Sequence, residues 1–334
     1  MKILVVRFSS IGDIVLTTPV IRALKMQLPQ CEIHYLTKET FLDLLKTNEH
    51  INKIFTIKKS IQEVSNELRL ERYDYIIDLH NNLRSLILAQ KLGVKRSPFP
   101  KLNIRKWLLV RFKWRLMPQL HVVDRYFQAV EFLGVENDQL PCEIAIPADC
   151  EVNTTERFGM YPKRFIAIAI GAQFATKRFP FNKLKEIIEK LDFPVLLVGG
   201  PTDMPLAQKL LDAMPNKQLK SACGQFNLLS SASIVCQSAA LITTDTGLMH
   251  IASCYNVPTV SVWGNTVPSL GMYPYFPQQK EKFSMHQIEE LSCRPCSKIG
   301  FPKCPKGHFN CMNLQNASAI AEDALNKVGL FTHE

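Results

Sequence analysis

The chain has 334 residues, of which 46% are hydrophobic; this is enough for two domains with sizeable cores and is ordinary for a globular protein. No apolar run approaches the roughly 18 residues of a membrane-spanning helix. Arg7 interrupts the short apolar N-terminus, so we do not expect residues 1–8 to be a signal peptide. The formal net charge is +10, and residues 91–125 hold ten Lys or Arg against one acid. We therefore expect a cytoplasmic protein with an anionic partner.

The first half of the chain alternates short apolar runs with segments of helical periodicity. Strands are predicted at residues 2–8, 31–36, 51–57 and 73–79, and helices at residues 14–28, 41–45, 61–70, 85–92 and 124–133. Residues 141–162 are polar and poor in apolar runs, which indicates a linker between two domains.

The alternation restarts after the linker. Strands are predicted at residues 165–170, 194–198, 239–242 and 258–262, and helices at residues 180–191, 204–214, 227–237 and 317–328. Two such series predict an α/β protein with two doubly wound parallel sheets. We expect domains over residues 1–150 and 151–315, and a final helix within 316–334 that packs back on the N-terminal domain. Ligands of such sheets bind beyond the carboxyl ends of the strands, so the expected site is a cleft between the domains.

Residues 243–250 form the most informative corner, because they carry polar groups where a buried strand ends and a helix begins. The first N–H groups of a helix lack partners and its dipole is positive there, so such a corner binds phosphate readily. Asp245 or Thr246 can cap the helix, and Gly247 lets a ligand approach the backbone closely. His250 lies one turn further in and can face the same ligand. An ordinary capped helix with a packed histidine is the alternative interpretation.

Two further corners of the second predicted sheet carry charged side chains. The loop at residues 171–180 offers Thr176 and Lys177 at a helix entrance, and the loop at residues 199–203 ends in Asp203. Together the three corners suit a nucleoside diphosphate, with Asp203 facing ribose hydroxyls. The chain contains no Asp-x-Asp motif to hold a divalent ion, so we expect Lys177 and the helix dipole to stabilise a leaving diphosphate.

Asp13 lies where the first strand gives way to a helix. Residues 9–13 lack the Gly-x-Gly-x-x-Gly fingerprint of a dinucleotide site, which argues against an oxidoreductase. The carboxylate of Asp13 is either a general base for an acceptor hydroxyl or a simple helix cap. A base in one domain facing a diphosphate in the other is the layout of a glycosyl transfer.

Four of the ten cysteines, with His308 among them, cluster near the C-terminus. They are Cys293, Cys296, Cys304 and Cys311. Reduced thiols at this density suggest a structural zinc with no open coordination position, and disulfides are disfavoured in a reducing compartment. The spacing is looser than that of a well-formed zinc ribbon, because it holds one Cys-x2-Cys pair, so the sequence leaves the zinc open.

The basic segment, residues 91–125, also holds aromatic side chains such as Trp107, Phe112 and Trp114. A basic stretch with interleaved aromatics suits nucleic acid, an anionic membrane surface or an acidic substrate. The alternative is a solvated helix with a few buried aromatics. A basic zinc-containing nucleic-acid-binding protein is therefore a rival interpretation, but such a module does not need two βαβ sheets with facing corners.

Four segments together resemble glycosyltransferase family 9, the ADP-heptose:lipopolysaccharide heptosyltransferases. They are residues 7–19, 177–180, 245–250 and 262–266, and the similarity runs over most of the chain. The resemblance implies a GT-B fold of two Rossmann-like domains. It also implies an inverting, metal-independent transfer of heptose from ADP-heptose to an inner-core acceptor of lipopolysaccharide. A related transferase that uses another nucleotide-activated sugar is the nearest alternative, because Asn265 and Val267 stand where the family usually has Pro and Asp.

The resemblance also implies roles for single residues. Asp13 becomes the catalytic base, and Lys177 stabilises the leaving diphosphate. Donor contacts are expected from Thr176, Lys177, Asp203, Asp245, Thr246, Gly247 and His250. Acceptor contacts are expected from Ser10, Gly12, Asn81, Arg84 and Arg105. The basic segment would dock the anionic acceptor or lipid A at the inner face of the inner membrane, with no cofactor required for catalysis and no nucleic acid bound.

Overall fold

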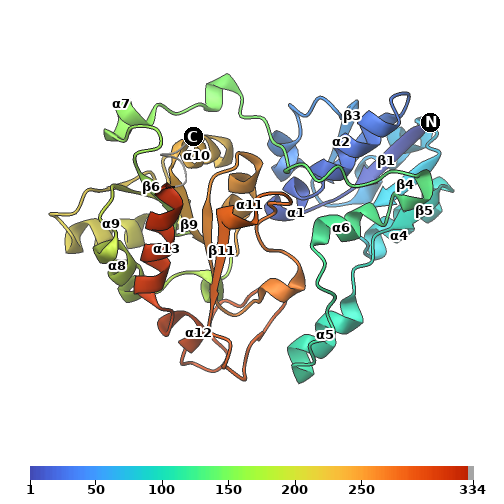
Figure 1. Ribbon diagram of the computed structural model, residues 1–334. Coiled ribbons are helices and arrows are strands. Elements are labelled where there is room, and N and C mark those ends of the chain that lie inside the picture. Colours follow the sequence, from blue (N-terminus) through green and yellow to red (C-terminus); the bar gives the residue numbers. More distant parts are fainter. Residues whose placement is uncertain (330–334) are drawn as a thin grey trace. The chain divides into compact units, whose positions relative to one another are not determined.

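The computed structural model describes residues 1–329, which fold into two compact units (Figure 1). Unit 1 comprises Met1–Leu102 and Leu120–Ala145, and unit 2 comprises Asn103–Gln119 and the chain from Ile146 onward. The predicted boundary at residue 150 lies close to the last crossing between the units. Residues 103–119, however, belong with unit 2, whereas the sequence placed them in the N-terminal domain.

Unit 1 is built on a five-stranded parallel sheet in the order β3-β2-β1-β4-β5. Its strands are β1 (Lys2–Val6), β2 (Glu32–Lys38), β3 (Lys53–Ile57), β4 (Tyr75–Asp78) and β5 (Lys95–Pro98). Its helices are α1 (Ile11–Val15), α2 (Thr18–Gln27), α3 (Ser65–Leu70), α4 (Leu83–Leu92) and α6 (Val122–Phe127). Leu4 and Val6 of β1 share a core with α3 and α4, and the alternate residues Ile3 and Val5 are buried as well. A strand buried on both faces explains the unbroken apolar run at the N-terminus.

Unit 2 is built on a six-stranded parallel sheet in the order β11-β10-β9-β6-β7-β8. Its strands are β6 (Ile166–Ala169), β7 (Val195–Val198), β8 (Leu219–Ser221), β9 (Ala240–Thr244), β10 (Thr259–Trp263) and β11 (Phe283–Gln287). Its helices are α5 (Asn103–Phe112), α7 (Thr154–Phe158), α8 (Phe181–Lys190), α9 (Met204–Ala213), α10 (Leu228–Gln237), α11 (Gly247–Cys254), α12 (Asn310–Asn313) and α13 (Ala317–Gly329).

The central strand β6 shows why this sheet is covered on both faces. Side chains of a strand alternate between its two faces. Ile166 and Ile168 pack in one core with apolar residues of α8, α9 and α13, whereas Ala167 and Ala169 pack in a second core with α10 and α11. The two parallel sheets with helices confirm the predicted fold class.

The last described helix, α13, packs against α8 within unit 2 (Figure 1). Its Ile320 and Ala324 are fully buried in the core that also holds Ile187 of α8. We expected this helix on the N-terminal domain, and the structure instead gives its apolar face to unit 2. Residues 330–334 of the expected segment lie outside the described residues.

Three strands that the sequence did not indicate, β5, β8 and β11, all lie at the edge of a sheet. An edge strand has a neighbour on one side only, so it does not need the continuous apolar run of a central strand. β5 is consequently hidden in the basic segment and ends at Pro98, which has no N–H to offer a further strand.

Candidate active site

Asp13 lies in unit 1 beyond the carboxyl end of β1, in the first turn of α1. The hydroxyl of Ser10 donates to Asp13 Oδ2 at 2.8 Å, and the Ser10 N–H donates to the same oxygen at 3.2 Å. Asp13 is thus the third residue of a capping box and not the cap itself, which belongs to Ser10. Gly12 is buried within the same turn. The structure therefore brings Ser10 and Asp13 together, as predicted, while Gly12 contributes only backbone to this turn.

The charge of Asp13 is set by Arg7, whose Nη2 lies 2.5 Å from Asp13 Oδ1. Burial acts to raise the pKa of Asp13, but Arg7 and the bonds from Ser10 hold that pKa down to about 2. The carboxylate is ionised at neutral pH, and 21% of its side chain is exposed. Sequence reasoning missed Arg7, although a cation at the end of an apolar strand signals a buried partner.

Three more polar side chains, Arg84, His80 and Asn81, lie at this edge of the first sheet. The guanidinium of Arg84 lies 5.1 Å from the ring centroid of Phe8, and the ring of His80 packs against the same phenyl ring at 5.0 Å. Asn81 has a left-handed backbone and donates from its amide to a backbone oxygen of unit 1 at 2.8 Å. The guanidinium of Arg84 therefore stacks on Phe8, and its contact with an acceptor stays a prediction, whereas the amide of Asn81 holds its turn.

In unit 2, three loops meet beyond the neighbouring strands β10, β9 and β6. Lys177 closes the short 3-10 helix η5 (Ala175–Lys177), and its Nζ lies 2.6 Å from Asp245 Oδ2. Thr266 Oγ1 donates to the same carboxylate oxygen at 2.9 Å. The side chains of Lys177 and Asp245 are 16% and 14% exposed. A cation and a carboxylate therefore lie side by side at an accessible sheet edge, which is where ligands of such sheets bind.

The N-terminus of α11 lies directly beside Asp245 in the chain. Thr246 is the residue before the helix, and in the described structure its hydroxyl makes no capping bond but lies 3.1 Å from Thr243 Oγ1. Gly247 begins the helix, so no side chain shields its first N–H groups there. His250 is 2% exposed, which favours the packed histidine of our alternative interpretation and gives His250 a supporting position under the corner.

Asp203 is held inside the protein more tightly than the sequence suggested. It closes η6 (Pro201–Asp203), is 5% exposed and accepts a bond from the Gly200 N–H at 2.8 Å. A Cβ at Gly171 would overlap its Oδ2, and a Cβ at Gly199 would lie 2.9 Å from the same atom. The carboxylate fills the space between two glycine loops, so its contact with ribose stays a prediction.

The model of glycosyltransferase family 9 (heptosyltransferase) matches residues 61–299, which is well over half of the chain. The chain belongs to glycosyltransferase family 9. As a member of that family it is a glycosyltransferase. The charged side chains described above, at the carboxyl edges of the two sheets, are its candidate active-site groups.

Relatives and solved structures agree with this assignment. Lipooligosaccharide heptosyltransferase 2 of Haemophilus influenzae is 25% identical over 325 residues, covering 87% of this chain and 89% of the relative. The ADP-heptose LPS heptosyltransferase II of Escherichia coli superposes with a TM-score of 0.72 at 21% identity, over 100% of both chains. The iron-containing dodecameric glycosyltransferase TibC of enterotoxigenic E. coli gives a TM-score of 0.56 at 12% identity, covering 99% of this chain and 76% of that one. At these identities the structural matches show the shared GT-B fold.

In the described structure the cysteine-rich segment, residues 293–311, does not bring its sulfur atoms together, and the structural zinc stays a prediction. Cys296 Sγ donates to the Cys293 carbonyl at 3.0 Å, and Cys293 Sγ lies 4.0 Å from His308 Nε2. Burial raises the pKa of Cys296 to about 11 and that of Cys311 to about 12. Among the described residues, no three sulfurs of Cys293, Cys296, Cys304 and Cys311 lie within 4.8 Å of one another. The donor atoms are present, but they do not converge as four zinc ligands must.

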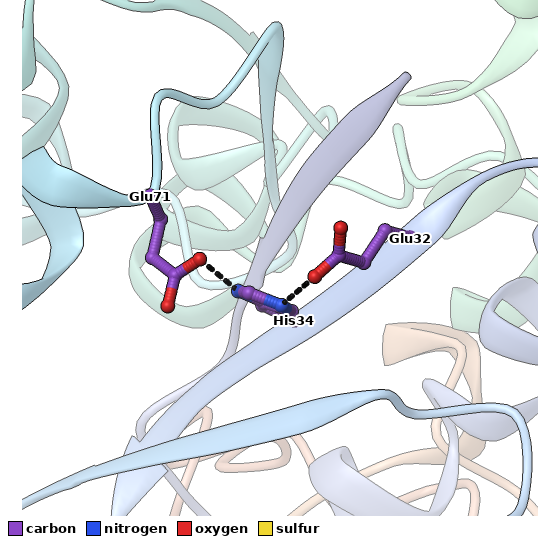
Figure 2. Close-up of side chains that lie close together, drawn as sticks. All are labelled: Glu32, His34 and Glu71. Carbon is purple, nitrogen blue, oxygen red and sulfur yellow. Dashed lines mark hydrogen bonds and ion pairs between the residues drawn. The ribbon is translucent and has the colours of Figure 1, made fainter.

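Figure 2 shows a different cluster, in which Glu32 and Glu71 of unit 1 flank His34. His34 Nε2 lies 2.9 Å from Glu32 Oε1, and its Nδ1 lies 2.8 Å from the Tyr73 hydroxyl. Lys2 Nζ lies 2.8 Å from Glu71 and 3.2 Å from Glu32, and Lys53 Nζ lies 2.6 Å from Glu71, so two lysines already balance the charge of the two acids. The cluster lies at the amino-terminal ends of β1 and β2, whereas Asp13 lies beyond the carboxyl end of β1, at the opposite edge of the sheet. We interpret it as an ion-pair network of the sheet.

The basic segment exposes its aromatic side chains, which excludes the interpretation as a helix with buried aromatics. Within this segment, large apolar side chains that are 49% to 76% exposed are Ile104, Trp107, Phe112, Trp114 and Leu116. Arg105 lies exposed on α5 in unit 2, whereas the other acceptor candidates all lie in unit 1, and its contact with the acceptor stays a prediction. None of the helices described for this glycosyltransferase combines the length and the apolar content needed to cross a bilayer.

Proposed function

We propose that this family 9 glycosyltransferase transfers heptose from ADP-heptose to an inner-core acceptor of lipopolysaccharide, with inversion and without a metal ion in the transfer. The observation that carries the proposal is the cluster of Lys177, Asp245 and Thr266 beside the uncapped start of α11. A lysine and free helix N–H groups at one sheet edge suit a diphosphate. The named relatives, which are heptosyltransferases, support the choice of sugar and acceptor.

The ion pair between Lys177 and Asp245 suggests how the donor is received. A diphosphate competes with Asp245 for the ammonium group, because it carries more negative charge than one carboxylate. Asp245 keeps its bond from Thr266 and is left to accept a hydrogen bond from a sugar hydroxyl. We therefore assign Lys177 and the first N–H groups of α11 to the diphosphate, and Asp245 to the donor sugar.

The chemistry needs one base and one stabilised leaving group. The acceptor hydroxyl attacks the anomeric carbon and gives its proton to the carboxylate of Asp13, while the bond to the diphosphate breaks and ADP departs with the electron pair. Lys177 and the α11 N-terminus stabilise the charge that develops on ADP. A direct attack on the face opposite the leaving group inverts the anomeric centre. The proposal assigns acceptor binding to unit 1 and donor binding to unit 2.

A donor panel tests this proposal against a related transferase that uses another activated sugar. We expect calorimetry to show that ADP binds and that UDP and GDP do not compete with it at equal concentration. We expect turnover with ADP-heptose and none with ADP-glucose or UDP-glucose. Turnover with a uridine-linked sugar and none with ADP-heptose would overturn the proposed donor.

The transfer is expected to proceed after metal removal, because Lys177 and the helix N-terminus supply the positive charge. We predict that wild-type protein dialysed against EDTA keeps its kcat with ADP-heptose to within about twofold. Metal analysis of the same sample shows whether the cysteines hold zinc. A loss of turnover that added Mg²⁺ restores, with the fold intact by circular dichroism, would contradict the metal-independent transfer.

We also propose that residues 104–116 dock the enzyme on the anionic membrane surface that carries its acceptor. The segment presents the exposed rings of Trp107, Phe112 and Trp114, and Phe112 lies within 5.5 Å of both other rings by centroid. Residues 92–123 contain no acid. Aromatic rings among cations are typical of surfaces that lie at the level of lipid headgroups.

This docking predicts a loss of vesicle binding when the exposed rings are removed. The variant Trp107→Ser/Trp114→Ser is expected to bind vesicles rich in anionic lipid about tenfold more weakly than wild type in a sedimentation assay. Leu70→Ser is the control, because it removes a large apolar side chain that is 82% exposed and lies outside residues 104–116. Wild-type binding by the double variant would contradict membrane docking here.

A further inference from the structure

Arg294 is a buried cation inside the cysteine-rich segment, and only 7% of it is exposed. Its Nε donates to the Gly264 carbonyl at 2.6 Å, and its Nη2 donates to the carbonyls of Trp263 and Thr266 at 3.1 and 3.0 Å. Two further oxygens at the end of β11 accept from the same side chain. One guanidinium group therefore holds the backbone of the loop that follows β10.

The cysteine-rich segment also binds the loop that follows β6. The Cys296 N–H donates to the Asn265 carbonyl at 3.1 Å, which adds a second bond to the β10 loop. The Phe301 N–H donates to Thr176 Oγ1 at 2.8 Å, and the Thr176 N–H donates to the Phe301 carbonyl at 3.2 Å. A Cβ at Gly264 would lie 2.9 Å from the Thr176 carbonyl, so the two loops lie against each other.

These two loops carry the groups of the proposed donor site. Thr266, whose carbonyl Arg294 holds, donates from its hydroxyl to Asp245 at 2.9 Å. Lys177 follows Thr176 in the chain and reaches the same carboxylate at 2.6 Å. A continuous path of bonds therefore runs from Arg294 through Thr266 and Asp245 to Lys177.

We propose that Arg294 is a positioning residue for the nucleotide-sugar site, acting through the β10 loop and without touching the donor. The inference rests on the proposed function, which assigns Lys177 and Asp245 to the donor. Thr266 can hold Asp245 in place only while its own backbone is fixed. Arg294 donates to the Thr266 carbonyl itself and to the carbonyls of Trp263 and Gly264 just before it. The cysteine-rich segment then serves as a brace for the donor corner whether or not it holds a metal.

The several carbonyls that accept from residue 294 require the multiple donors of an arginine side chain. A guanidinium group offers five donors in a rigid planar fork, whereas an ammonium group offers three donors from one point. Lysine at position 294 keeps the charge but cannot reach carbonyls that lie on several sides of the group. Arg294→Lys therefore separates the shape of the side chain from its charge.

The test measures donor and acceptor parameters separately for Arg294→Lys. We expect KM for ADP-heptose and Kd for ADP to rise about tenfold, with KM for the acceptor unchanged, because the altered loop belongs to the donor side. Thr266→Val is expected to produce a similar rise. The double variant should be no worse than the poorer single variant, since both changes interrupt the same path.

Lys298→Ala is the matched control, since it removes an exposed cation four residues along the same segment. Arg294→Ala with added guanidinium chloride at millimolar concentration provides a rescue, and partial recovery of ADP affinity is expected. A purely structural role would lower the unfolding temperature of Arg294→Lys and leave KM for the donor at the wild-type value, which would overturn the inference. If wild-type protein binds neither ADP nor ADP-heptose, the proposed function fails first, and the two failures are thereby distinguished.

Discussion

Asp13→Asn is expected to lower kcat by about 10²- to 10⁴-fold while leaving ADP affinity unchanged. The amide keeps the shape of the side chain and still accepts a bond from Ser10, but it cannot take the proton of an acceptor hydroxyl. Donor affinity is retained because the proposed donor groups all lie in unit 2. The measurement is steady-state turnover of ADP-heptose with a lipopolysaccharide acceptor, paired with calorimetry of ADP.

Asp43→Asn is the matched control for this prediction. Asp43 lies in the same unit and pairs with Lys46 at the surface, where its side chain is 71% exposed. We expect this variant to turn over like wild type. Near-normal turnover by Asp13→Asn would rule out Asp13 as the base, whatever the control does. Thermal unfolding of both variants shows whether the loss of the Arg7 ion pair has also weakened the fold.

The pH dependence of kcat is a second test of Asp13 as the base. The folded pKa of Asp13, held down to about 2, lies below its ordinary value, so its carboxylate is ionised over the whole assay range. The ion pair with Arg7 therefore stabilises the fold above about pH 4 and is lost as the pH falls toward 2. The pKa of the nearby His80 is lowered by burial and by neighbouring cations to about 3, so this ring is neutral over the same range. We expect kcat to show no protein-derived acid limb between about pH 5 and pH 8.

Lys177→Ala is expected to weaken ADP binding about tenfold and to lower kcat/KM for ADP-heptose about 100-fold or more. The lost ammonium group lies 2.6 Å from Asp245, so its removal leaves an unneutralised carboxylate beside the place where the diphosphate must bind. The effect on kcat/KM exceeds the effect on binding, because the charge on the leaving group grows in the transition state. Calorimetry of ADP and initial rates with ADP-heptose measure the two effects.

Lys185→Ala controls for the general loss of positive charge in unit 2. Lys185 lies on the surface of α8 and pairs with Glu189 one turn later. We expect wild-type ADP affinity from this variant. If Lys177→Ala bound ADP as tightly as the control, the diphosphate would have to lie elsewhere in unit 2.

The fold could be predicted where burial leaves a pattern in the sequence. Central strands such as β1 and β6 are buried on both faces, so they appear as unbroken apolar runs. The edge strands β5, β8 and β11 leave no such run, and the final helix α13 does not say which sheet its apolar face covers. The placement of residues 103–119 with unit 2 is likewise a matter of tertiary contacts that local periodicity does not encode.

The candidate site could be predicted only as far as strand ends bring residues together. Loops after neighbouring strands place Lys177 beside Asp245, as parallel topology requires. The burial of Asp203 and His250 could not be predicted, because it depends on glycine loops and helix packing elsewhere in unit 2. Arg294 left no signal at all, since a lone arginine between cysteines is equally typical of a solvated loop.

The most direct test of the central claim is the transfer reaction itself. Purified protein is incubated with ADP-heptose and a panel of truncated lipopolysaccharide acceptors, and both free ADP and the mass of the acceptor are followed. We predict that ADP is released in step with the addition of one heptose to an inner-core acceptor, and that the new linkage has the inverted anomeric configuration. ADP-heptose that stays intact with every acceptor, while another nucleotide sugar is consumed, would contradict the account.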